Sequence, residues 1–484
     1  MHHELWLDEA HHWLLARDSV SMLDLFKNTR YEGHPILWNI LLFGITRCTL
    51  NPFWMQFLHI LISTSVVFIF LRKAPFSFVF KTLFIFGYFM LFEYNVISRN
   101  YILGVLFLFL TCSVFKDRNT KFTLLCVYLA IAANSHMMFV IISFAVFLTL
   151  LLEQFQNKNL FNKTNLVGYF IFVIGITIAI FQIIPPSDTL FFDHVNQMTF
   201  TEKFTKGFIS LFKGLITIPD FRTIHFWNSN FLVNLSKPIT AFIGLLIYII
   251  PLLLFKNRKI IFFFYIGLVG TNLFFFFTQM SATRYDGINY ILFIIALWIE
   301  KFYTSENYKI KGFLNSLQLT LFKKPIIYSI LITQLFSGIY AYSMDFKYQF
   351  ASANATVNYL KEKKLNAKEI ISITCDGTTI SPYLEKKVWF LSDGGYESYC
   401  HWNYTSVSNF SQKNCIDMVS SYLKTHNDAI YVSYYSISDK IKTSNWQQLN
   451  DTIKIRFLKK YDNAIIANSS YSIFEVARIT KLIK

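Results

Sequence analysis

Apolar runs separated by short charged segments constrain the fold of this chain more than any other feature of its sequence. A helix that crosses a membrane needs about 20 mostly apolar residues, and several runs approach that length. Only 15% of the residues are charged, against about 25% in a typical soluble domain. We therefore predict a multi-pass α-helical membrane protein with spans at about residues 54–71, 76–92, 101–115, 121–134, 137–152, 165–184, 239–255, 260–278, 287–300 and 325–343.

The net charge of +16 predicts membrane topology rather than nucleic-acid binding. Lys and Arg gather in alternate short loops, and such loops stay on the cytoplasmic side. These loops contain Arg72, Lys73, Lys116, Arg118, Lys121, Lys158, Lys163, Lys256, Arg258, Lys259, Lys301, Lys309, Lys311, Lys323 and Lys324. The short turns on the other side hold mainly Arg99 and Arg284. The N-terminus, the long loop at about 185–238 and all residues after about 344 are therefore expected outside the cytoplasm.

Four polar segments then meet at the outer face of the predicted bundle. They are the N-terminal stretch Trp6–Arg17 and the turns at residues 93–101, 134–136 and 283–287. Ionisable residues near the ends of membrane helices are functional candidates. This convergence predicts a functional site at the outer face.

Residues 35–49 form an apolar segment that is short for a membrane span. We expect a helix in or near the membrane interface, with Trp38 as an aromatic anchor, and a short span is the competing interpretation. Met1 is followed at once by polar residues with no signal-peptide pattern. Because an outer N-terminus needs a preceding helix to carry it across, we expect the natural chain to start before Met1.

The adjacent carboxylates Asp8 and Glu9 are the first candidates for chemistry. They suit a general base with its neighbour, or two ligands of a divalent cation to which Glu93 could contribute. The simpler interpretation is a solvated loop in which Asp8 caps a helix. His11 and His12 are adjacent and lie on different helix faces, so they do not predict a paired metal site.

Three further residues at the outer face have both a functional and a structural interpretation. Glu93 and Arg99 could be a second acid with its ion-pair partner, or only a neutralising pair at a helix end. His136 could orient a substrate, or bond a backbone carbonyl. Arg284 could hold a lipid phosphate in the bidentate geometry of a guanidinium, or act as an interfacial anchor.

The chain after residue 344 is more polar and alternates between strand-like and helical patterns. Strand-like runs lie at 369–374, 387–391, 429–433, 464–467 and 472–476, and helical patterns at 351–364 and 415–424. This alternation predicts a small α/β domain, without a Gly-rich phosphate-binding loop.

The six cysteines follow no metal-binding spacing. Those in or beside the apolar segments, Cys48, Cys112 and Cys126, are expected to be packing residues. A disulfide such as Cys400 with Cys415 is compatible with an extracytoplasmic C-terminal part, which also contains Cys375.

Three short motifs resemble those of the GT-C superfamily of membrane glycosyltransferases, in particular the protein mannosyltransferase and aminoarabinose transferase group. They are Trp-Leu-Asp-Glu-Ala at 6–10, Tyr-Glu-Gly-His-Pro at 31–35, and Ile-Ser-Arg-Asn-Tyr-Ile-Leu-Gly at 97–104. In that group an Asp-Glu pair lies in the first extracytoplasmic loop. A His-Pro opens a helix that lies flat on the membrane, and an Arg-x-Tyr motif follows a later outer turn. The resemblance covers about the first 300 residues. Those proteins have a helix before the acidic loop, which agrees with an earlier start of this chain.

The resemblance implies a polyprenyl-phosphate-linked sugar donor and a glycan, lipid or protein acceptor. Asp8 would take the acceptor proton, with Glu9 beside it, and Arg284 and Arg99 would hold the donor phosphate. Substrate orientation would fall to His34, Glu93, Tyr101 and His136. A single base with direct displacement implies inversion at the anomeric carbon. A metal at Asp8, Glu9 and Glu93 stays open.

The expected organisation is a catalytic membrane domain at 1–343 followed by an extracytoplasmic α/β domain at 344–484. Residues 1–53 would form the acidic loop and interfacial helix, and residues 54–343 about ten spans. A transporter or lipid flippase and a non-catalytic scaffold are the alternatives, and the first would place ionisable residues deep in at least two spans. A composition rich in Lys, Ile, Asn and Phe hints at a bacterial inner-membrane protein with a periplasmic active face.

Overall fold

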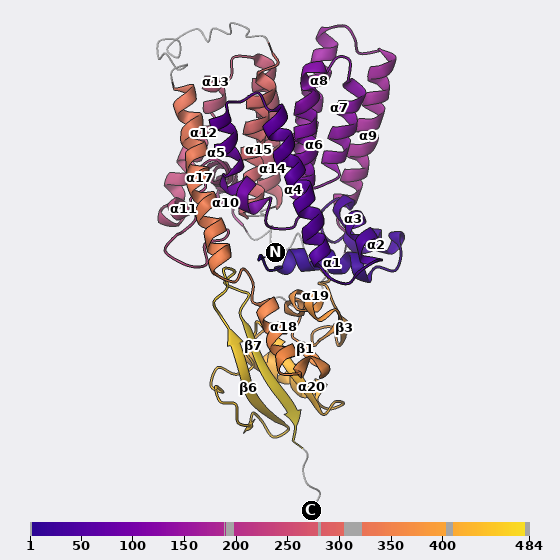
Figure 1. Ribbon diagram of the computed structural model, residues 1–484, viewed down its shortest axis with the longest axis vertical. Helices are drawn as coiled ribbons and strands as arrows, with labels where there is room; N and C mark the ends of the chain where they lie inside the picture. The colour runs from indigo at the N-terminus through magenta and orange to yellow at the C-terminus, as the bar shows by residue number, and fades with distance from the viewer. Residues whose placement is uncertain are drawn as a thin grey trace, which may run out of the picture.

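A bundle of apolar helices and a mixed sheet make up the computed structural model of this protein (Figure 1). The structure describes residues 2–187, 189, 198–278, 282–303, 322–402 and 410–479. The sheet lies beyond one end of the bundle, and helix α1 (Leu7–Asp18) lies between the two parts.

The apolar runs of the sequence form the helices of the bundle. Within the described ranges, six helical segments are long and apolar enough to cross a membrane, which supports the predicted membrane protein. They are α4 (Phe53–Lys73), α8 (Met137–Gln156), α9 (Lys163–Ile183), α12 (Lys237–Ile247) continued by α13 (Ile250–Leu254), α14 (Arg258–Thr278) and α17 (Lys323–Lys347). The other predicted spans form shorter or more polar helices: α5 (Phe78–Ile85) with the π-helical turn η1 (Phe89–Glu93), α6 (Tyr101–Val114), α7 (Phe122–Ala133) and α15 (Thr283–Glu300).

Helix α15, which carries Arg284 in its first turn, is enclosed by other helices. Every residue from Tyr285 to Ile299 is buried, and the helix contacts α6, α8, α10 (Phe200–Leu215) and α14. A helix that is apolar all round needs neighbours on every side. This enclosure fixes the position of Arg284 at its first turn.

Three short helices cover the end of the bundle that faces the sheet: α1, α2 (Met22–Thr29) and α3 (Leu37–Thr46). Helix α3 has 10 residues, so it extends about 15 Å, half of a bilayer core, and does not cross it. The expectation that Trp38 is an interfacial anchor is wrong. Its ring is fully buried, 6.1 Å from the ring of His59 in α4, because α3 packs against α1 and α4.

The long segment between α9 and α12 contains structure that the sequence analysis did not predict. Helix α10 packs against α12, α14 and α15, and the short helix α11 (Phe231–Leu235) precedes α12. Thr199 and Glu202 form a capping box at the start of α10. This pattern was readable in the sequence. The polar residues of this segment favour a loop, and the structure has a helix there.

The C-terminal part contains a seven-stranded sheet with helices on both faces. Its order is β3-β2-β1-β4-β7-β6-β5, with β1 parallel to β2 and β4 and the remaining pairs antiparallel. The strands are β1 (Ile370–Ser372), β2 (Val388–Phe390), β3 (Gly395–Glu397), β4 (Asp428–Ser433), β5 (Gln447–Gln448), β6 (Ile453–Tyr461) and β7 (Tyr471–Arg478). Helix α18 (Ala353–Glu362) packs on one face, and α20 (Gln412–Tyr422) on the other.

Most of the predicted α/β pattern agrees with this sheet. Runs 369–374, 387–391, 429–433 and 472–476 correspond to β1, β2, β4 and β7, and both predicted helices form. The predicted strand at 464–467 is wrong, because Ala464 makes only one isolated bridge, to Gln349. β7 pairs with β4 on one side and with β6 on the other, and in β6 charged residues alternate with apolar ones from Ile453 to Phe457.

A disulfide joins Cys375 to Cys400 rather than Cys400 to Cys415. Cys375 follows β1 and Cys400 follows β3, so both lie beside the same three-strand region, with a Cα–Cα distance of 5.1 Å. Cys415 lies on the face of α20 that packs against the sheet, where its side chain belongs to the apolar core. Burial in that core keeps it away from Cys400.

Residues of the sheet part hold helix α1 and the residues just before it. The Leu5 backbone N–H donates to the Tyr383 hydroxyl at 2.8 Å, and the Cys400 backbone N–H donates to His11 Nδ1 at 3.3 Å. Ser398 also donates to the Asp18 carboxylate. The sheet part therefore helps to place the helix that carries the two adjacent acids.

The predicted topology can be tested with cysteines at the two ends of the bundle. Cys48 is exposed in the turn between α3 and α4, at the end near the sheet, and Lys158 lies beyond α8 at the opposite end. We expect an impermeant maleimide to label Cys48 on intact cells. In a Cys48→Ser background, Lys158→Cys should react only after the membrane is permeabilised. The reverse pattern would overturn the predicted topology.

Candidate active site

The first turn of α1 presents its two acids in different directions. The helix begins at Leu7, after Trp6 in an extended conformation, so Asp8 lies inside the helix and is not its cap. Successive helical residues are rotated by about 100° around the axis. Asp8 and Glu9 therefore contact different partners and have different chemistry.

Asp8 lies between two guanidinium groups. Its Oδ2 atom accepts a hydrogen bond from Arg99 Nη1 and another from Arg284 Nη2 at 3.3 Å. Burial by itself would raise the pKa of Asp8, but the charges of Arg99 and Arg284 outweigh this effect and hold it below its ordinary value. The Asp8 side chain is still 26% exposed, whereas Arg99 is 3% exposed. The carboxylate is thus ionised and within reach of a ligand.

Aromatic rings hold the two arginines in place. The Trp6 ring lies 5.1 Å from the guanidinium carbon of Arg284 and 5.7 Å from that of Arg99. Arg284 also lies 5.0 Å from the Tyr285 ring, and Trp227 packs edge-on against Trp6 at 4.7 Å. Cation–π contacts of this kind favour fixed orientations for the guanidinium groups.

A cluster of neutral rings lies next to the arginines. His34 and His136 are 4.4 Å apart between ring centroids, and His136 and Tyr101 are also 4.4 Å apart. Burial, together with the positive charge of Arg99, lowers the pKa of His34 to about 3, so this imidazole is uncharged. Uncharged imidazoles offer both a donor and an acceptor for hydrogen bonds.

Several buried polar atoms of this site lack a hydrogen-bond partner among the described residues. They are the Tyr101 hydroxyl, His136 Nε2, Arg99 Nε and Arg284 Nε. Buried polar groups in proteins are nearly always paired. Their concentration around Asp8 indicates a place built for a polar ligand.

Glu9 has a structural environment. Its side chain is fully buried, and its oxygens accept hydrogen bonds from the backbone N–H groups of Ser98, at 2.6 Å, and Trp6, at 3.2 Å. Because Ser98 precedes Arg99, this contact ties the Arg99 turn to α1. Glu9 is therefore a positioning residue for the contact between Asp8 and Arg99.

His3 extends the same network to the last membrane helix. Its Nδ1 atom is 2.9 Å from Asp345 in α17, and its Nε2 atom is 3.3 Å from Glu9. Burial by itself lowers the pKa of His3, but Asp345 and Glu9 outweigh it and raise the pKa to about 10. The imidazolium therefore links α1 to α17 by charge.

This network predicts a pH-dependent stability. Because the pKa of His3 is about 10 in the fold and ordinarily 6.5, its contribution is complete below pH 6.5 and is lost as the pH rises toward 10. We expect the melting temperature in detergent to decline over that range. The decline should be smaller in His3→Gln than in the parent. In the control variant His2→Gln it should be as large as in the parent, because the His2 ring only stacks on Phe346. Parallel profiles for His3→Gln and the parent would contradict this role.

Glu93 does not pair with Arg99, as one interpretation of the sequence had suggested. Its Oε2 atom instead accepts hydrogen bonds from the Tyr88 hydroxyl at 3.2 Å and from Trp227 Nε1 at 3.1 Å. Trp227 in turn contacts Trp6. Glu93 thus helps to hold the Trp227 ring, which packs against Trp6 beside the two arginines.

His11 and His12 face different partners, as expected for adjacent helical residues. His11 Nε2 is 2.6 Å from Glu32, and His12 Nδ1 is 3.1 Å from Asn39 in α3. Across the part of the chain that the structure describes, no three His, Cys, Asp or Glu side chains are grouped to hold a metal ion. Asp8, Glu9 and Glu93 belong to three separate hydrogen-bond sets.

Sequence reasoning did not single out several residues around the site. Trp6 lies within the first motif. Its packing against Arg284 could not be predicted, because the two residues are far apart in the chain. Lys213 of α10 forms a buried ion pair with Asp286 at 2.7 Å, which fixes the first turn of α15. A Lys in an apolar helical pattern was the only available signal for this pair.

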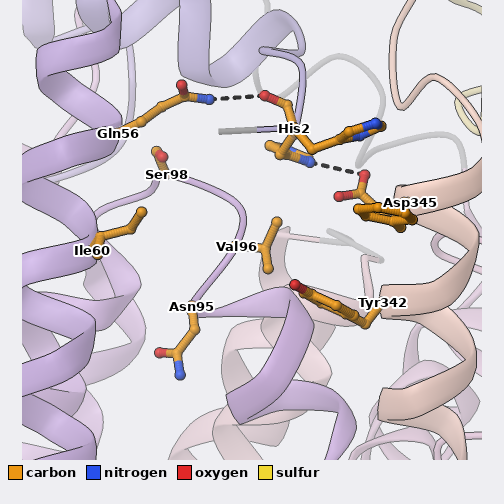
Figure 2. A pocket seen from close by; sticks show the side chains of 10 residues that line it. His2, Gln56, Ile60, Asn95, Val96, Ser98, Tyr342 and Asp345 are labelled. Atoms are coloured by element: carbon orange, nitrogen blue, oxygen red, sulfur yellow. Dashed lines mark hydrogen bonds and ion pairs between the residues drawn. The ribbon is translucent and has the colours of Figure 1, made fainter.

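A cleft lies beside the site between α4 and α17 (Figure 2). Its volume is about 200 Å³. The turn that carries Asn95, Val96 and Ser98 forms one wall, and the His3–Asp345 contact closes one side. Because Ser98 lies in both the cleft wall and the Glu9 contact, the cleft adjoins the Asp8 site.

Comparisons with models of protein families, with curated proteins and with solved structures found no match.

Proposed function

We propose that this protein is a membrane glycosyltransferase that moves a sugar from a polyprenyl-phosphate donor to an acceptor, by the chemistry of the GT-C superfamily. The observation that carries the proposal is the partly exposed Asp8 carboxylate held between Arg99 and Arg284. A carboxylate suits proton removal, and paired guanidinium groups suit a phosphate.

Binding of the donor would convert Asp8 into a better base. Both arginines now neutralise Asp8, which holds its pKa low. A donor phosphate would compete for Arg99 and Arg284 because guanidinium groups bind phosphate oxygens in a bidentate manner. Once their charge faces the phosphate, the carboxylate loses this stabilisation and its proton affinity rises.

The proposed reaction is a single displacement. The acceptor oxygen forms a bond to the anomeric carbon while the bond from that carbon to the phosphate oxygen breaks. The acceptor proton goes to Asp8, and the electron pair of the broken bond leaves with the phosphate, where the arginines stabilise the charge. One displacement inverts the anomeric configuration, unlike the two-step route of retaining glycosidases.

The surroundings of Asp8 support the two parts of such a donor. The unpartnered atoms of Tyr101 and His136 can bond sugar hydroxyls. The cleft between α4 and α17 offers the apolar side chains Ile60, Val96 and Phe346 to a lipid chain. These features favour a lipid-linked sugar over a soluble sugar nucleotide.

The test is sugar transfer in membranes that contain the protein. Polyprenyl phosphates carrying different radiolabelled sugars are supplied one at a time, and the released sugar and labelled products are analysed. We expect release from one donor class, with a product of inverted anomeric configuration by NMR. A retained configuration would exclude the single displacement. Membranes that bind none of the donors and release no sugar would contradict the proposed function.

A further inference from the structure

A crevice lies where the sheet part meets α1. Strand β1 has β2 on one side and β4 on the other, and all three are parallel. The chain order therefore reverses beside β1, and ligands of open α/β sheets bind at the carboxyl ends of strands at such a point. Thr374 follows β1 here, and Tyr434 and Tyr435 follow β4.

The crevice has a volume of about 250 Å³ and closes against α1. Pockets for small ligands usually range from about 300 to 1,000 Å³, so this one suits a small ligand such as a single ring. Its lining combines aromatic, apolar and hydrogen-bonding side chains: Trp6, Tyr434, Tyr435, Leu7, Cys375, Ile466, Thr374, Asp376, Asn468 and Ser469. Trp6 Nε1 is a buried donor with no hydrogen-bond partner among the described residues.

The crevice offers no charge to a ligand. Its lining residues include no Lys, Arg or His, which a phosphorylated ligand would need. The one carboxylate, Asp376, is buried and accepts hydrogen bonds from the Ser433 hydroxyl and from the backbone N–H groups of Tyr434, at 3.1 Å, and Thr374, at 2.8 Å. A neutral ligand with apolar faces and a hydroxylated edge fits this surface.

The crevice and the Asp8 site share Trp6. The same indole lines the crevice and packs against Arg99 and Arg284. Leu7, the residue before Asp8, also lines the crevice. A ligand bound there would thus lie next to the carboxylate that we propose as the base.

We propose that this crevice binds a neutral sugar ring of the acceptor, so that the acceptor is a glycan. The inference rests on the proposed glycosyl transfer and adds the class of acceptor to it. Sugar rings have apolar C–H faces that pack on aromatic side chains and hydroxyls that bond Ser, Thr and Asn. An acceptor recognised through phosphate groups would need cationic side chains, which this lining lacks.

The test blocks the crevice in the full-length chain. Asn468 is exposed at the crevice, and Gln448 is exposed on β5, at the far edge of the sheet. Each is changed to Cys in a Cys48→Ser background and labelled with fluorescein maleimide. Two readouts are taken: sugar transfer from the donor to water or to methyl glycosides, and binding of methyl glycosides by saturation-transfer NMR.

With the labelled Asn468→Cys protein we expect loss of glycoside binding and of transfer to glycosides, while release to water persists. The labelled Gln448→Cys protein should keep glycoside binding, transfer to glycosides and release to water. Unchanged glycoside binding in labelled Asn468→Cys, or transfer only to a phosphorylated lipid or a peptide, would overturn the inference. If the parent binds glycosides in the crevice but releases no sugar from any donor, the proposed function fails and the sugar site remains.

Discussion

Sugar transfer is expected to fall by about 10²–10⁴-fold in Asp8→Asn, the range that a positioned general base contributes. The amide keeps the shape of the carboxylate but cannot take the acceptor proton. Donor binding should persist, because Arg99 and Arg284 no longer share their charge with Asp8. The measurement is the initial rate of transfer, with donor binding titrated separately.

Asp24→Asn is the matched control for this substitution. Asp24 is also an acid in the first turn of a short helix at this end of the bundle, but it is only partly buried and its carboxylate accepts a hydrogen bond from the nearby Val20 backbone N–H. Its variant should transfer sugar at the parental rate. Parental rates in Asp8→Asn, with the protein correctly folded by size-exclusion chromatography, would remove Asp8 from the role of base.

Arg284→Ala is expected to weaken donor binding by roughly 10- to 100-fold, because a hydrogen bond to a charged group contributes roughly 1.5–3 kcal/mol. Acceptor binding should change much less, since the guanidinium faces Asp8 and the proposed phosphate position. Separate titrations of donor and acceptor analogues measure the two effects.

Arg222→Ala is the control for Arg284→Ala. Arg222 is a half-exposed arginine that pairs with Asp220 in the segment before α11 and lies over the Phe231 ring. Its removal should leave donor binding unchanged. Equal losses of donor and acceptor binding in Arg284→Ala would show a general disturbance of the site rather than a lost phosphate contact.

The sequence allowed the convergence of the site to be predicted because membrane topology is encoded locally. Apolar length and the distribution of Lys and Arg assign each turn to a side, so Asp8, Arg99, His136 and Arg284 could be expected at one end of the bundle. The structure brings all four together. The resemblance added His34 and Tyr101, which join the same cluster.

The roles of individual side chains could not be predicted in the same way. Asp8 and Glu9 are neighbours of the same type, and only the packing of the Ser98 turn decides that Glu9 is enclosed while Asp8 meets the arginines. The disulfide of Cys375 with Cys400 likewise depends on strand order. Strand β6 was missed because its partner β7 and its exposed face, not its own residues alone, determine its pairing.

The position of α1 between the bundle and the sheet imposes an order on biosynthesis. Residues 5–18 emerge from the ribosome first, yet their partners Tyr383, Ser398 and Cys400 are made last. Contacts of such long sequence separation close late in folding. The growing bundle therefore forms before the contacts that hold α1 against the sheet part can be made.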